Sequence, residues 1–77
     1  MVNDKKLPLD LYFLEKYART FNVDISDITE IQTSEGACKG FIVVNNNDET
    51  VKYFWHEDSK TVLEEIDGDV KEASYIN

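Results

Sequence analysis

The first regular pattern in the chain is an apolar stripe with helical spacing between Pro8 and about Phe21. Apolar residues recur there at intervals of four and three, which places them on one face of an α-helix. Pro8 suits the first helical turn because its missing N–H would have no partner there. Asn22 suits the exit because asparagine tolerates a left-handed backbone. We therefore expect an amphipathic helix whose stripe is formed by Leu7, Leu11, Leu14, Ala18 and Phe21.

After the helix the pattern changes to an alternation of period two. Residues 23–31 fit either a helical turn or a strand, and we predict a short turn of helix followed by a strand from about Ile28 to Thr33. Further apolar and β-branched runs alternate with turn residues. The predicted fold class is α+β, with one N-terminal amphipathic helix packed on an antiparallel β-meander of four to five strands. The later strands are expected at residues 41–44, 50–56, 61–66 and 70–76, and the turns at 34–36, 45–48, 57–60 and 67–68.

The middle strands are apolar on both faces, although a single helix can cover only one face. Alternation places Tyr53 and Trp55 on one face and Phe54 on the other. The sequence does not indicate which face the helix covers. One interpretation leaves an aromatic face with Phe41, Tyr53 and Trp55 open, as in the core of a protein interface. The other closes that face through sheet twist and the C-terminal segment around Tyr75.

The composition describes residues 1–77 as a single small acidic domain. A hydrophobic content of 42% excludes a disordered acidic tail, and the length allows one modest core.

No apolar leader follows Met1, and no run approaches the roughly 18 apolar residues of a membrane span. Cys38 is the only cysteine, which suits the reducing cytosol. We expect a soluble cytoplasmic protein that does not bind a membrane.

The formal net charge of −8 is unevenly distributed along the chain. Residues 1–19 hold four cations and three carboxylates, whereas residues 20–77 hold four cations and thirteen carboxylates. Such an excess either keeps the protein soluble or steers it to a basic partner, and both interpretations remain open. Seven of the carboxylates fall in one stretch: Glu57, Asp58, Glu64, Glu65, Asp67, Asp69 and Glu72.

Candidate catalytic and metal-binding residues are few. His56 is the sole histidine, and Cys38 is the only thiol that could serve as a nucleophile beside it. The two residues lie on different predicted strands, with no local signature of a nucleophile and base. The turns at 45–49 and 67–69 offer oxygen ligands but lack the spacing of a calcium loop. We therefore expect no enzyme activity, no cofactor and no metal site.

One stretch has a local resemblance to a known family. Residues 14–28 resemble the part of helix-turn-helix repressors in which one helix ends and a short one begins. The segments that would supply a recognition helix are absent, and an acidic chain repels phosphate. We therefore assign no residue a role from this resemblance and expect no direct binding to nucleic acid.

These observations predict a non-catalytic protein-binding module whose partner is a basic protein or a second copy of the chain. A specific form is an inhibitor whose acidic face mimics nucleic acid, of the kind used as antagonists by phages and mobile elements. The alternative is a small structural homodimer or adaptor that uses the aromatic sheet face without mimicry. The expected partner-binding residues are Phe41, Tyr53, Trp55, Glu57, Asp58, Glu64, Glu65, Asp67 and Asp69.

Overall fold

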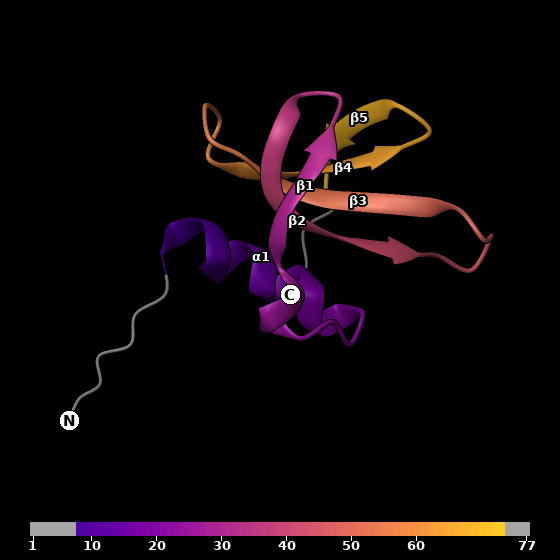
Figure 1. Cartoon of the computed structure of the whole chain (residues 1–77), viewed down its shortest axis with the longest axis horizontal. Helices are drawn as coiled ribbons and strands as arrows, with labels where there is room; N and C mark the ends of the chain where they lie inside the picture. Colours follow the sequence, from indigo (N-terminus) through magenta and orange to yellow (C-terminus); the bar gives the residue numbers. More distant parts are fainter. Residues whose placement is uncertain (1–7, 74–77) are drawn as a thin grey trace.

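The computed structural model describes residues 8–73 and has the predicted α+β architecture (Figure 1). One helix is followed by a single 3₁₀ turn and five strands in meander order, each antiparallel to the next. The prediction of one N-terminal helix and an antiparallel meander is confirmed. The elements are α1 (Leu9–Thr20), η1 (Ile25–Asp27), β1 (Thr29–Thr33), β2 (Gly36–Val44), β3 (Thr50–His56), β4 (Thr61–Ile66) and β5 (Asp69–Glu72).

Helix α1 ends as its sequence indicates. Asn22 adopts a left-handed backbone with φ of 60°. The N–H of Val23 donates to the carbonyl of Ala18, and the N–H of Asn22 donates to that of Arg19. These two bonds form a Schellman motif, which satisfies carbonyls that the helix end would leave unpaired. Pro8 lies one residue before the helix rather than in its first turn.

Two strand predictions differ from the structure. Strand β2 begins at Gly36, five residues before the predicted start, because residues 36–40 pair with β1. Strand β5 ends at Glu72, whereas the prediction extended to residue 76. The segment around Tyr75 lies outside the described residues.

Helix α1 covers the sheet face that carries the aromatic residues of β2 and β3. Phe13 stacks on Trp55 with ring centroids 5.9 Å apart, and Tyr17 stacks on Tyr53 at 5.7 Å. Phe41 is 2% exposed and Tyr53 is 8% exposed. The prediction that Phe41, Tyr53 and Trp55 line an open face is therefore wrong. Aromatic side chains at i and i+4 on the helix match the spacing of those on the strands, so the two sets form the core instead.

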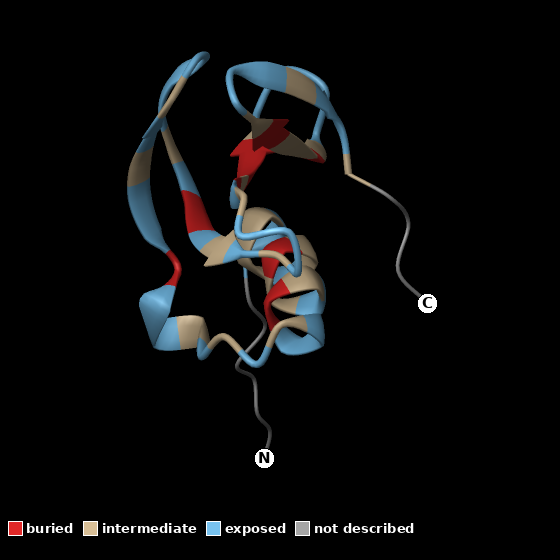
Figure 2. Ribbon diagram, turned by 90° about the vertical axis from the view of Figure 1, so that its right-hand side faces the viewer, coloured by how far each residue is buried: buried red, intermediate tan, exposed pale blue. Residues whose placement is uncertain are grey.

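The opposite face is partly closed by the β1–β2 hairpin, which bends over β3. In Figure 2 the hairpin stands on the left, β5 leads to the C-terminus on the right, and α1 lies below. Strand β2 pairs with β1 up to Gly40 and with β3 from Gly40 onward. A Cβ atom at residue 40 would collide with the carbonyl oxygen of Tyr53 and lie 2.7 Å from the Cα of Phe54. Glycine therefore permits the bend, and Phe54 beneath it is fully buried.

Hydrogen bonds hold the bent hairpin against β3 and β4. The N–H and hydroxyl of Ser34 donate to the same carboxylate oxygen of Glu65, at 3.0 and 3.1 Å. The ammonium of Lys52 donates to the carbonyl of Gln32 at 2.7 Å. Glu65 is 8% exposed, so its predicted role in contacting a partner is wrong. Its charge is used within the fold, because a buried carboxylate needs donors close at hand.

Candidate interaction site

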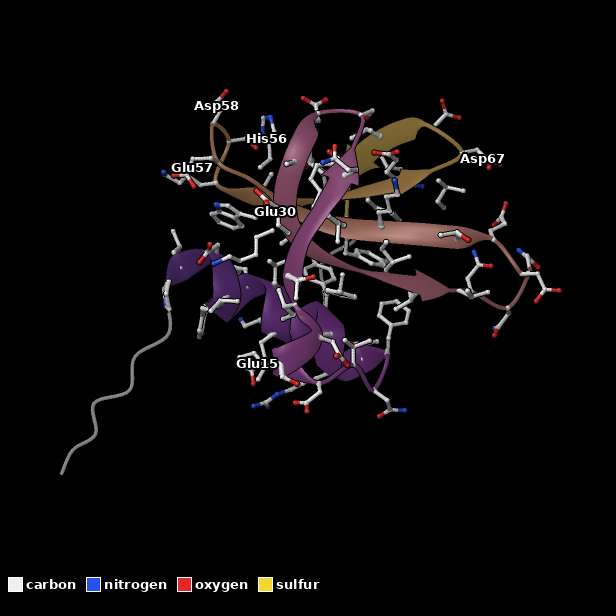
Figure 3. All side chains as sticks on the ribbon, in the orientation of Figure 1. Glu15, Glu30, His56, Glu57, Asp58 and Asp67 are labelled. Atoms are coloured by element: carbon white, nitrogen blue, oxygen red, sulfur yellow. The ribbon has the colours of Figure 1, made fainter. Side chains whose placement is uncertain are left out.

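One groove in residues 8–73 lies where the β1–β2 turn meets the β3–β4 turn. Alternate turns of a meander lie at the same end of the sheet, and the N-terminal end of α1 reaches the same place. We call this hollow the Trp55 groove, and its volume is about 390 Å³. Figure 3 shows His56, Glu57 and Asp58 together at this end and Asp67 at the other. The lining residues are Asp10, Glu35, Ala37, Cys38, Lys39, Trp55, His56, Glu57 and Asp58.

The Trp55 groove is strongly acidic. Four carboxylates come from three elements of the fold, and one lysine faces them. That lysine, Lys39, lies 3.4 Å from a carboxylate oxygen of Asp10 and neutralises that group. Asp58 is exposed and forms no hydrogen bond or ion pair with any residue between 8 and 73. Lys60, which borders the groove, pairs with Glu57, so the excess negative charge that faces solvent comes from Glu35 and Asp58.

Trp55 and Glu57 form the fixed wall of the groove. The indole N–H of Trp55 donates to one carboxylate oxygen of Glu57 at 2.9 Å, and the ammonium of Lys60 donates to the other oxygen. The bond from Lys60 and, after it, the bond from Trp55 lower the pKa of Glu57. Both bonds favour the ionised form, so Glu57 carries its charge at neutral pH. Phe13 supports the other side of the Trp55 ring.

His56 lies between the two turns that border the groove. Its Nδ1 lies 2.7 Å from the hydroxyl of Ser59, and its Nε2 lies 4.0 Å from a carboxylate oxygen of Glu35. Cys38 lines the same groove, and its Sγ lies 3.8 Å from the hydroxyl oxygen of Thr33, which donates its proton to the carbonyl of Gly36 at 2.7 Å. No hydrogen bond joins Cys38 to His56 in the structure of residues 8–73. Only the Ser59 contact is within hydrogen-bond distance, so His56 is bonded within the β3–β4 turn and approaches Glu35 without a hydrogen bond to it.

Three of the predicted partner-binding carboxylates lie away from the Trp55 groove. Glu64, Asp67 and Asp69 line a second groove at the opposite end of the sheet, together with Glu49. Glu64 also accepts a hydrogen bond from the hydroxyl of Tyr53 at 3.2 Å. The predicted acidic surface is thus not one face, because successive turns of a meander project from opposite ends.

Sequence reasoning missed two carboxylates of the Trp55 groove, Asp10 and Glu35. Both lie outside the acidic stretch at 57–72, so a count along the chain does not group them with it. The signal was available in the turn order. The turn at 34–36 and the turn at 57–60 are two connections apart, and in a meander this places them at the same end.

Within residues 8–73, no group of three or more His, Cys, Asp or Glu side chains is arranged to hold a metal ion. The one helix in that range is too short and too polar to cross a membrane. Comparison of the chain with protein-family models, curated proteins and solved structures finds no significant match.

Proposed function

We propose that this protein is a non-catalytic protein-binding module whose Trp55 groove receives basic side chains of a partner protein. The observation that carries the proposal is the edge of Trp55 in an acidic groove, where carboxylates from three segments lie around it. The second groove has as many carboxylates but no aromatic residue in its lining. Arginine and lysine side chains match such a surface, since their cations pair with carboxylates and their stems pack on apolar walls. Negative charge of this kind attracts basic partners, and the attraction weakens as the salt concentration rises.

A more specific form of the proposal is an inhibitor that mimics nucleic acid. Residues 8–73 carry fifteen carboxylates and six Lys or Arg side chains, and many of the carboxylates project from tight turns. In this form, Glu35, Glu57 and Asp58 take the places of phosphates in the cleft of a DNA- or RNA-binding protein. The hydrogen bonds to Glu57 support it, because positioned charges lose less entropy on binding than mobile ones.

The proposal includes a cytoplasmic location and no cofactor. The single free thiol, Cys38, is compatible with a reducing compartment. The partner surface no longer includes Phe41, Tyr53 or Glu65, since these side chains are buried and line no part of the groove. Trp55 is buried too and contributes only the edge that lines the groove, while Glu57 and Asp58 are retained and Asp10 and Glu35 are added.

The test captures partners from host lysate on the immobilised protein at low and high salt. We expect a basic protein that elutes as the salt concentration rises, and duplex DNA that competes for it if the mimic form is right. The test variant is Glu35→Gln/Glu57→Gln/Asp58→Asn, which removes three charges from the groove and keeps an acceptor for the Trp55 indole. Capture of the basic protein should fall at least tenfold.

The matched control is Asp48→Asn/Asp67→Asn/Asp69→Asn, which removes three charges at the opposite end. Asp48 and Asp67 have positive φ angles that asparagine tolerates, so the fold should be preserved. The control should bind as the native protein does. Equal losses in both variants, or binding that salt does not weaken, would contradict the proposed site.

A further inference from the structure

One segment of β2 has a strand neighbour on only one side. Strand β1 pairs with residues Gly36 to Gly40, and β3 pairs with residues Gly40 to Val44. The segment Phe41–Val44, which we call the β2 edge, therefore lies beside β3 alone. In an antiparallel ladder, alternate residues direct their N–H and C=O groups to opposite neighbours. About half of the backbone groups of the β2 edge thus point away from β3, and no strand within residues 8–73 pairs with β2 on that side beyond Gly40.

The side chains of the β2 edge are apolar and exposed. Ile42 is 49% exposed and Val44 is 65% exposed, and both lie on the sheet face opposite α1. No charged residue occurs between Gly40 and Asn47. The outer strands of the sheet differ in this respect, since β5 carries Asp69, Lys71 and Glu72 and β1 carries Glu30. Charges on edge strands prevent pairing with other chains, and the β2 edge lacks that protection.

We propose that the β2 edge pairs with the β2 edge of a second copy of this chain. Antiparallel pairing about a twofold axis through Val43 keeps equivalent faces on the same side. It brings Ile42 opposite Val44 of the second copy, and Val44 opposite Ile42 of the second copy. Two cross-strand pairs of β-branched side chains are then buried, and the free backbone groups complete a ladder. The result is one continuous sheet across two molecules.

The charge of the protein restricts where two copies can meet. Two molecules with a net charge of −8 repel each other, so they can approach only where carboxylates are sparse. The β2 edge meets that condition and is complementary to itself. A four-residue pairing is small beside the roughly 1,200 Å² of a stable interface, so the dimer is weak and reversible. Salt should strengthen it, because salt screens the repulsion between the copies.

This interface is independent of the proposed partner site. The β2 edge ends at the turn of residues 45–49, at the end of the sheet opposite the Trp55 groove. A dimer would therefore present two open grooves to a partner. The salt dependences also differ in sign, since self-association increases with salt and binding of a basic partner decreases. Either proposal can therefore be contradicted without affecting the other.

The test is sedimentation of the native chain and two variants over a range of concentrations at low and high salt. Val44→Lys places a charge on the exposed edge, and Leu9→Lys makes the same change at a 52% exposed position on α1. The native chain and Leu9→Lys should dimerise more strongly as concentration and salt increase. Val44→Lys should raise the dissociation constant by about tenfold or more. A native chain that stays monomeric at about millimolar concentration, or equal dimerisation of all three proteins, would overturn the proposal.

A second readout locates the interface. Amide hydrogen exchange at residues 41–45 of the native chain should slow as the concentration rises, because pairing satisfies the free N–H groups. The same amides in Val44→Lys should show no concentration dependence. Slowing at β5 or β1 instead would mean that another edge forms the dimer, which contradicts the assignment.

Discussion

Replacing Gly40 with alanine tests the bend in β2 that brings the β1–β2 hairpin over β3. The added Cβ would collide with the carbonyl oxygen of Tyr53 and lie 2.7 Å from the Cα of Phe54. Both obstacles belong to the backbone of β3, so no side-chain rotation relieves them. The strands must separate at their pairing point, or the hairpin must open and expose Phe54.

Overpacking of this kind costs about 1–3 kcal/mol, and a backbone obstacle places Gly40→Ala near the upper limit. Loss of glycine flexibility in the unfolded chain offsets about 0.4–1 kcal/mol of that. We expect a net loss of about 2 kcal/mol in the free energy of unfolding. For a domain of this length, that corresponds to roughly 8–16 °C in Tm.

Urea unfolding followed by circular dichroism measures the change. Gly68→Ala is the comparison, because a Cβ at residue 68 meets no atom within 4 Å and only the positive φ of 84° opposes it. That strain costs about 1 kcal/mol. If Gly40→Ala loses less than about 0.5 kcal/mol, or no more than Gly68→Ala, the close approach of β2 to β3 is not as described.

Three further outcomes follow from other contacts. Glu65→Ala should lose about 1–3 kcal/mol of unfolding free energy, since both Ser34 donors lose their acceptor. Glu65→Gln keeps an acceptor and should lose less. Urea unfolding of both variants measures the difference, and equal losses would contradict the expected role of the Ser34 bonds. Burial and, after it, the charge of Glu64 raise the pKa of Tyr53 to about 12. Tyr53 ionises near pH 10 in the unfolded chain but only near pH 12 in the folded protein. The free energy of unfolding of the native protein should therefore fall by about 2 kcal/mol as pH rises from about 10 to about 12. Alkaline unfolding curves of Tyr53→Phe should lack that loss. Trp55 is 6% exposed, so its fluorescence should be blue-shifted and resist acrylamide quenching, and an emission like that of the unfolded chain would contradict its burial.

Much of the fold could be predicted from local patterns. The stripe on α1, the left-handed exit at Asn22 and the strands at 50–56 and 61–66 depend on residues close together in sequence. The side of the sheet that α1 covers depends on the match between Phe13 and Tyr17 on the helix and the aromatic residues of β3. Neither face of the strands differs enough in composition to decide this beforehand.

The candidate site was harder to predict because it depends on a bend and on turn order. Apolar runs on both faces of β2 and β3 indicated an open surface, but the bend at Gly40 buries Phe54 and Glu65 on the second face. A glycine between Lys39 and Phe41 does not by itself distinguish a bend from a turn. The carboxylates near Trp55 come from segments that are distant in sequence, so a count of charges along the chain does not group them.

The most direct test of the Trp55 groove is a nuclear magnetic resonance titration of the labelled protein with an arginine-rich peptide at low salt. Amide shifts should move at residues 35–39 and 55–60, and salt should reverse the change. Residues 64–71, which line the second acidic groove, should respond much less. Equal movement at both ends of the sheet would mean that the peptide senses net charge alone, and it would contradict a specific site at Trp55.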